Sequence, residues 1–308
     1  MWLAYGALLL GLACAGMGGE LFVRGTVGLA EWARLSPGII AATVAAFATS
    51  SPELTVAVTS ALSGHPEISL GDALGSNVVN VAVILGSTLL IAPLYAARSS
   101  VRRDFPVALV LPVLLGVLLW DGELSRLDGT VLLGVFAAWF AAVVSEVRRQ
   151  RSAVGEVLGE THPRHAISFS LVGLALLIAA GELIVSGAES IAQALGLSQF
   201  LIGAVIVSIG TSMPELATSI VSRIKGHDEV GLGTVLGSNI YNGLFILGIA
   251  ATLHPIRVPI AASAPTLIVG LAAVAISFPA ATGRIGRWRG GLLLALYLVY
   301  VAAVAQVA

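Results

Sequence analysis

The sequence predicts an all-α fold, a polytopic membrane protein with ten transmembrane helices arranged as two inverted five-helix repeats. The first observation is composition: only 11% of the 308 residues are charged and 57% are apolar, whereas a typical soluble domain has roughly 25% charged residues. The second is a series of apolar stretches that approach or exceed the ~20 residues a helix needs to cross a bilayer. The third is a match of the chain with itself at an offset of 162 residues.

The same composition excludes several classes of protein. A charged fraction of 11% is too low to cover a soluble enzyme. The net charge of −1 provides no basic face for a nucleic acid. The one cysteine, Cys14, excludes an internal disulfide framework and a multi-cysteine metal site. The partner that the composition requires is therefore the lipid bilayer, and nothing in it indicates an obligate protein partner.

The expected helices follow one another with short connections. In chain order they cover residues 2–22, 37–62, 70–93, 104–120, 127–146, 166–186, 199–222, 230–252, 258–280 and 290–306. The segments between them hold nearly all the charges and many of the prolines and glycines. About 20 residues separate the fifth helix from the sixth. Division there gives a first repeat of residues 1–154 and a second of residues 155–308.

The basic residues predict the orientation of the chain. With the N-terminus outside, 14 of the 16 Lys and Arg residues fall in loops that face the cytoplasm, and only Arg126 and Arg257 lie outside. Cytoplasmic loops are enriched in Lys and Arg. We therefore expect both termini outside. The bias also supports the count of ten helices, because one missed helix would place the basic residues of the later loops on the wrong side.

The internal match identifies the repeats. Residues 20–93 align without gaps onto residues 182–255, with 29 identities in 74 positions. Thr-Ser-Ser-Pro-Glu-Leu (49–54) falls on Thr-Ser-Met-Pro-Glu-Leu (211–216), and Leu-Gly-Ser-Asn (74–77) on Leu-Gly-Ser-Asn (236–239). The offset spans five helices, an odd number, so the second repeat must be inverted in the membrane. Inverted repeats are typical of secondary transporters, which bind substrate near the midplane between the repeats.

Two glutamates mark the candidate site. Glu53 and its partner in the second repeat, Glu215, lie well inside apolar spans. A carboxylate at membrane depth costs on the order of 2.5–3.5 kcal/mol on insertion scales and usually marks function. The preceding Pro52 and Pro214 cannot donate a backbone hydrogen bond and displace the carbonyls four residues earlier. Those carbonyls belong to Ala48 and Gly210, and hard cations prefer such oxygens.

Neutral oxygen groups surround these glutamates in both repeats. They are the hydroxyls of Thr49, Ser50, Thr211 and Ser212, and the i,i+4 pairs Ser76 and Asn80, and Ser238 and Asn242. Gly75 and Gly237 leave room for a second helix to approach closely. Because all of these ligands are oxygens, the set favours Na⁺ or Ca²⁺ over Zn²⁺ or Cu⁺. Kinked helices and hydrogen-bonded helix contacts could explain single residues, but not the whole set repeated at one spacing.

These motifs resemble the α-repeats of the Na⁺/Ca²⁺ exchangers, within the cation/Ca²⁺ exchanger superfamily, and above all the prokaryotic members without a large cytoplasmic regulatory domain. The resemblance implies a central Ca²⁺ site held by Glu53 and Glu215 with the backbone carbonyls of Thr49 and Thr211, completed by Asn80 and Asn242. It implies flanking Na⁺ sites that use the hydroxyls of Ser50, Ser76, Ser212 and Ser238 and the carbonyls of Ala46 and Ser208. Some relatives have aspartate at the position of Asn242, and this departure leaves the coupling ion open.

The expected function is secondary antiport of Ca²⁺ and Na⁺ by alternating access in the plasma membrane of a prokaryote, with helices 1 and 6 sliding past the rest. No cofactor and no enzymatic activity are expected. A Ca²⁺/H⁺ antiporter or a monovalent substrate stays open, and a cation channel or an intramembrane protease is less favoured. Asp72, on the same helix face as Ser76, either adds charge at the external mouth of the site or is simply solvated. For Glu20 and Glu182 a structural role is favoured.

Overall fold

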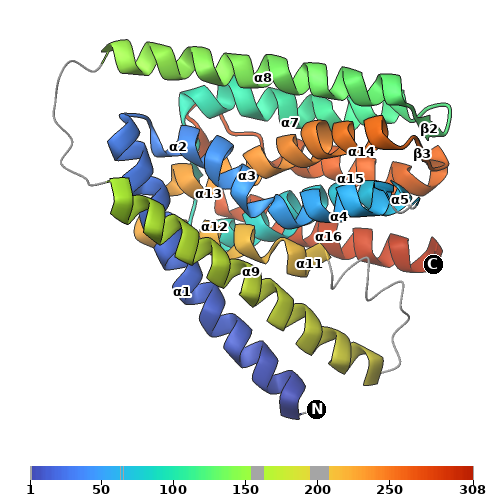
Figure 1. Cartoon of the computed structure of the whole chain (residues 1–308), viewed down its shortest axis with the longest axis horizontal. Coiled ribbons are helices and arrows are strands. Elements are labelled where there is room, and N and C mark those ends of the chain that lie inside the picture. The colour runs from blue at the N-terminus through green and yellow to red at the C-terminus, as the bar shows by residue number, and fades with distance from the viewer. Residues whose placement is uncertain (1, 63, 65, 154–162, 195–207, 308) are drawn as a thin grey trace.

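The computed structural model describes residues 2–62, 64, 66–153, 163–194 and 208–307, and these are almost entirely helical (Figure 1). The first half contains α1 (Trp2–Ala33), α2 (Pro37–Ile40), η1 (Ala41–Ala45), α3 (Ala46–Thr49), α4 (Ser51–Leu62), α5 (Pro66–Val78), η2 (Val79–Leu85), α6 (Gly86–Ile91), α7 (Arg98–Leu118) and α8 (Arg126–Ala153). The second half contains α9 (Pro163–Ala194), α11 (Ser208–Thr211), α12 (Met213–Lys225), α13 (Asp228–Ile240), η4 (Tyr241–Ile246), α14 (Leu247–Leu253), α15 (Ile260–Ser277) and α16 (Arg287–Val307). The η elements are π-helical turns.

The polytopic membrane fold is confirmed, whereas the count of ten spans stays a prediction. Among the described residues, six helices are long and apolar enough to cross a membrane, or seven if the stretches 37–49 and 51–62, bent by 45°, form one span. A described helix overlaps every expected span, although the start of the span at 199–222 lies outside the described residues. The helices α1 and α9 continue beyond the expected ends at 22 and 186.

The long helices α1 and α9 pack along each other at small residues. A Cβ on Gly18 would lie 2.9 Å from Leu176 Cβ, and one on Gly173 would lie 2.5 Å from the backbone nitrogen of Phe22. Such contacts bring two helices to backbone distance. Figure 1 shows this pair crossing obliquely beneath the other helices, which run roughly parallel to one another.

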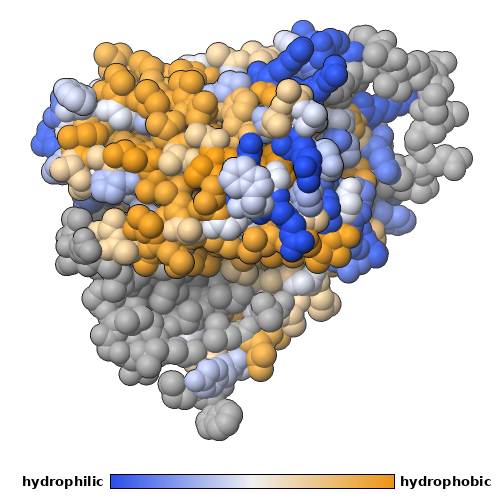
Figure 2. All heavy atoms as spheres, turned by 180° about the vertical axis from the view of Figure 1, so that it is seen from behind, coloured by the Kyte–Doolittle hydropathy of each residue, from blue (hydrophilic) through white to orange (hydrophobic). Residues whose placement is uncertain are grey.

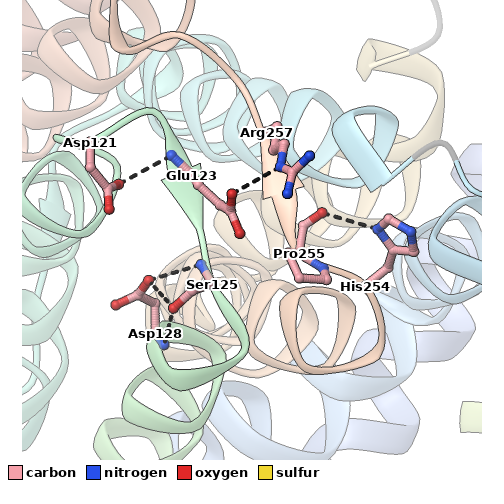
Figure 3. Close-up of polar contacts among 7 residues, drawn as sticks. All are labelled: Asp121, Glu123, Ser125, Asp128, His254, Pro255 and Arg257. Carbon is pink, nitrogen blue, oxygen red and sulfur yellow. Dashed lines mark hydrogen bonds and ion pairs between the residues drawn. The ribbon is translucent and has the colours of Figure 1, made fainter.

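Two short antiparallel ladders join the halves, and the all-α prediction did not include them. Strand β1 (Leu94–Tyr95) pairs with β4 (Arg284–Ile285), and β2 (Glu123–Leu124) pairs with β3 (Ile256–Arg257). Figure 3 shows the second ladder, where Arg257 Nε lies 2.9 Å from Glu123 Oε2. Beside it, Ser125 and Asp128 cap α8, with Ser125 Oγ 2.6 Å from Asp128 Oδ2.

The surface and the interior divide as expected for a protein in lipid. Leu127, Leu171 and Leu298 are exposed, and Figure 2 shows a largely hydrophobic face with hydrophilic atoms gathered toward one edge. In contrast, an apolar 18-residue stretch within Asp228–Leu253 is 89% buried, and one within Pro66–Ile91 is 72% buried. These two central spans carry the serine and asparagine pairs of the candidate site.

Candidate cation site

Each candidate glutamate follows a break in its helix. Ser50 has φ −85° and ψ 12° between α3 and α4, and Ser212 has φ −85° and ψ 10° before α12. Pro52 and Pro214 lie one residue before the glutamates. Proline ends the run of backbone hydrogen bonds locally, so the Thr-Ser turn and the Glu side chain meet at the break. The same local geometry therefore occurs in both halves.

The carbonyls near these breaks differ from the sequence expectation. The Ala48 carbonyl, expected to be free, accepts a hydrogen bond from Ser51 Oγ at 2.7 Å. The Ala46 carbonyl accepts two bonds, from Ser50 N at 2.9 Å and from Thr49 Oγ1 at 3.2 Å. A carbonyl oxygen has two lone pairs. A cation at Ala46 must therefore displace the Thr49 hydroxyl.

The second half repeats this arrangement. Thr211 Oγ1 donates to the Ser208 carbonyl at 3.2 Å, and Ser212 N donates to the same oxygen at 3.3 Å. Thr49 is buried, whereas Thr211 is only half-buried. The two threonines thus donate to equivalent carbonyls but have unequal surroundings.

The two glutamates lie buried and close to each other. Glu53 and Glu215 are each 1% exposed, and their carboxylates lie close enough to repel. Glu215 Oε1 accepts a hydrogen bond from Ser238 Oγ at 3.0 Å, and the hydroxyls of Thr49 and Ser50 also lie near this carboxylate. The Oε2 atom of each glutamate has no hydrogen-bond partner.

Other buried polar atoms around the glutamates are also left without partners. Buried polar groups are nearly always hydrogen-bonded, so a cluster of exceptions marks atoms that are available to bind a ligand. The unpartnered atoms include the hydroxyls of Ser50, Ser76 and Ser212, Asn80 Oδ1, and both Nδ2 and Oδ1 of Asn242. Within the described residues no three His, Cys, Asp or Glu side chains form a metal cluster. The set is therefore two carboxylates with neutral oxygens, which suits a hard cation.

Close helix packing at the two expected glycines is confirmed. A Cβ on Gly237 would lie 2.6 Å from the carbonyl oxygen of Ala42 and 2.7 Å from Ala46 Cβ. A Cβ on Gly75 would lie 3.2 Å from Ser208 Oγ. Each glycine thus brings its helix against the segment that leads into the Thr-Ser turn of the opposite half.

The sequence reasoning missed two central asparagines. Asn77 Nδ2 donates to the backbone oxygen of Asn239 at 3.2 Å, and Asn239 Nδ2 donates to that of Asn77 at 3.2 Å. Asn80 Nδ2 donates to Asn239 Oδ1 at 3.0 Å. Asn80 and Asn242 each lie in the first turn of a π-helix, η2 and η4, and single π-turns are frequent at functional sites. The Leu-Gly-Ser-Asn match contained the signal for Asn77 and Asn239.

The remaining candidates lie outside this cluster or at its margin. Asp72 is half-buried on α5 and lies within electrostatic range of Glu53. Glu20 forms ion pairs with Arg24 at 2.5 Å and Lys225 at 3.0 Å, which fits the structural role expected for it. Glu182 is exposed on α9.

Comparison with known sequences decides the family. The sequence pattern of the family described as "Sodium/calcium exchanger protein" matches residues 3–144 and again residues 165–306. The chain belongs to this family. The two matches begin 162 residues apart, the same offset as the internal match of the sequence.

Individual relatives agree over nearly the whole chain. The exchanger is 35% identical to the putative antiporter CaxA of Alkalimonas amylolytica, over 95% of this chain and 96% of CaxA. It is 25% identical to the sodium/calcium exchanger MaX1 of Methanosarcina acetivorans, over 96% of each. A structure of the sodium–calcium exchanger NCX_Mj, soaked with 10 mM Na⁺ and 10 mM Sr²⁺, matches with a TM-score of 0.83 at 30% identity, covering 97% of this chain and 98% of that chain.

These findings confirm the resemblance inferred from the α-repeat motifs. The protein is a prokaryotic member of the cation/Ca²⁺ exchanger superfamily. It is a membrane-bound cation/Ca²⁺ antiporter and not an enzyme.

Proposed function

We propose that the exchanger moves Ca²⁺ across the plasma membrane in exchange for Na⁺, by giving alternate access to one central cation site. The observation that carries the proposal is the charge of this site. Glu53 and Glu215 are each 1% exposed, and among the described residues neither forms an ion pair with a basic side chain. Two adjacent buried carboxylates repel strongly at low dielectric. A cation must therefore neutralise them, and Ca²⁺ or Na⁺ can do so.

The neutral oxygens around the carboxylates supply further ligands. Ca²⁺ takes 6–8 oxygen ligands. Glu53 and Glu215 would hold Ca²⁺ with the backbone carbonyls of Thr49 and Thr211. The remaining ligands proposed, for the central region and for Na⁺ on either side of it, are Asn80, Asn242, the hydroxyls of Ser50, Ser76, Ser212 and Ser238, and the carbonyls of Ala46 and Ser208. The unpartnered side-chain oxygens of Ser50, Ser76, Ser212, Asn80 and Asn242 support this assignment.

Shared ligands make the binding of the two ions mutually exclusive. A carboxylate oxygen that holds Ca²⁺ is not available to Na⁺, so the site carries one kind of ion or the other. Because the proposed repeats 1–154 and 155–308 are inverted, equivalent half-sites face the two sides of the membrane. Sliding of the α1–α9 pair along the remaining helices would open each side in turn. Both termini would lie outside the cell.

Exchange of Ca²⁺ for H⁺ is the second candidate. The observation that favours it is Asn242, a neutral side chain at a position where some relatives carry aspartate. With two rather than three carboxylates, protons on Glu53 and Glu215 would neutralise the site as completely as metal ions do. The unpartnered Oε2 atoms offer the positions for these protons.

The test is Ca²⁺ uptake into proteoliposomes under defined gradients. An outward Na⁺ gradient at equal pH is expected to accelerate uptake, while a K⁺ gradient of the same size is not. Glu53→Gln and Glu215→Gln are expected to abolish uptake without loss of the folded protein. Glu123→Gln is the matched control, because Glu123 pairs with Arg257 at 2.9 Å in a surface ladder. Acceleration by a pH gradient and not by Na⁺ would refute the proposal in favour of H⁺ coupling.

A further inference from the structure

The two central spans meet through a reciprocal pair of amides. Asn77 and Asn239 occupy equivalent positions of the two halves, and each donates its Nδ2 hydrogen to the backbone oxygen of the other at 3.2 Å. Asn239 is buried, and the Oδ1 atom of Asn77 is also enclosed. The pair therefore lies at the centre of the contact between the halves, where any symmetry axis relating them must pass.

The hydrogen bonds around this pair are not symmetric. Asn80 Nδ2 donates to Asn239 Oδ1 at 3.0 Å. The equivalent bond in the other half would run from Asn242 Nδ2 to Asn77 Oδ1, and both of these buried atoms lack partners. The serines are also unequal, with the bonded donor in the second half: Ser238 donates to Glu215 at 3.0 Å, whereas the Ser76 hydroxyl has no partner.

The formed bond has a consequence for the cation site. Once Nδ2 of Asn80 is held by Asn239, its Oδ1 atom points away from that bond, and this oxygen is buried without a partner. Asn80 is thus fixed with an acceptor free for a cation. The side-chain amide of Asn242 is not fixed by a hydrogen bond of this kind, because both its Nδ2 and its Oδ1 atoms are unpartnered.

We propose that Asn77 and Asn239 are positioning residues that orient the two site amides in turn, Asn239 holding Asn80 in one access state and Asn77 holding Asn242 in the opposite state. The inference rests on the proposed exchange function. Inverted repeats present equivalent half-sites to the two sides of the membrane. If the two halves exchange conformations when access switches, a bond made in one half in one state is made in the other half in the opposite state. The reciprocal backbone bonds of Asn77 and Asn239 do not need to change.

The test is the Ca²⁺ concentration for half-maximal flux, measured separately on each face of the membrane. Right-side-out and inside-out vesicles are separated by a tag on the C-terminus. Asn239→Ala is expected to raise this concentration on one face roughly tenfold, because a buried hydrogen bond that orients a ligand is lost. Asn77→Ala is expected to raise it on the opposite face by a similar factor, with little change in maximal rate. Asn→Ser at either position replaces Asn→Ala if that variant does not fold.

The double variant separates positioning from simple attachment of the halves. If the amides act in opposite states, Asn77→Ala with Asn239→Ala shows both single shifts, one on each face. If the pair only holds the two halves together, the second substitution adds little, because the first substitution has already broken that contact. Equal shifts on both faces, or no shift in either folded variant, would overturn the proposal. Thr88→Val is the control, because it removes a buried hydroxyl bond of 2.7 Å outside the site.

The two proposals fail in different ways. Wild-type vesicles that drive Ca²⁺ uptake with H⁺ and not with Na⁺ would refute the proposed coupling ion. The face-specific shifts would still be measurable with the H⁺ gradient, so the positioning role is tested independently.

Discussion

Substitution of Gly237 by alanine is expected to disturb the cation site through packing alone. Gly237 has no role as a ligand, but its α-carbon faces the segment that leads to Thr49. An added Cβ would lie 2.6 Å from the Ala42 oxygen and 2.7 Å from Ala46 Cβ, whereas ordinary contact begins at 3.4 Å. The helix α13 must therefore retreat by about 0.8 Å, the difference between 3.4 and 2.6 Å.

This displacement sets the expected magnitude. Overpacking of a tightly filled interior costs about 1–3 kcal/mol of stability. Ser238, which donates to Glu215 at 3.0 Å, is the next residue on the displaced helix. Because cation ligands must converge, we expect the apparent Ca²⁺ dissociation constant to rise at least ~10-fold, or 1.4 kcal/mol.

The assay combines thermal unfolding in detergent with equilibrium Ca²⁺ binding. Gly71→Ala is the matched control, because a Cβ there meets nothing within 4 Å. Alanine is the better helix former by up to ~1 kcal/mol, so this control should unfold at the same or a higher temperature and bind Ca²⁺ normally. Gly75→Ala should be intermediate, since its nearest neighbour is the movable Ser208 hydroxyl at 3.2 Å. Normal binding by Gly237→Ala would refute the reasoning.

Further predictions concern single hydrogen bonds. Without added cation, Ser238→Ala should lower the free energy of unfolding by about 1–3 kcal/mol because it removes a hydrogen bond from the buried Glu215 carboxylate, while Ser76→Ala should change it little because its hydroxyl has no partner. Denaturant unfolding measures the free energy of unfolding of both variants. Equal losses of stability in the two would contradict this prediction. Trp139→Phe removes a 3.1 Å bond to buried Asp104 and should cost about 1–3 kcal/mol while leaving Ca²⁺ flux per folded molecule unchanged. A fully folded Trp139→Phe variant with reduced Ca²⁺ flux would contradict a purely structural role for the Trp139–Asp104 hydrogen bond.

The sequence was sufficient for the fold class and for the family, which the repeated motifs indicated. Glu53 and Glu215 were recognisable because a carboxylate in an apolar span has few explanations other than function. The close approach at Gly75 and Gly237 was also predictable, because both glycines lie in the repeated motif next to the serines. The family match extends this agreement over nearly the whole chain.

Other features depend on contacts that no local pattern encodes. The ladders β1–β4 and β2–β3 have two residues per strand and join segments far apart in sequence, so no alternation of apolar residues marks them. The hydroxyl of Ser51 donates a hydrogen bond to the Ala48 carbonyl at 2.7 Å. The rotamer of Ser51 that allows this bond cannot be read from the sequence. The extension of α1 to Ala33 was missed because Arg24 and Glu31 resemble loop charges.

The asparagine pair shows a different limit. Asn77 and Asn239 match in the repeats as clearly as Ser76 and Ser238 do, yet repetition alone does not say which residues hold a ligand and which hold each other. Only the cross-half bonds of 3.2 Å distinguish the two roles.

Equilibrium Ca²⁺ binding to the purified exchanger, measured with Na⁺ replacing choline in separate series at two or more fixed pH values, tests the central claim most directly. If Glu53 and Glu215 form one site for which the two ions compete, the apparent Ca²⁺ dissociation constant should rise steadily with Na⁺ while maximal binding stays constant. A dissociation constant that is unchanged by Na⁺ and changes only with pH would contradict the account.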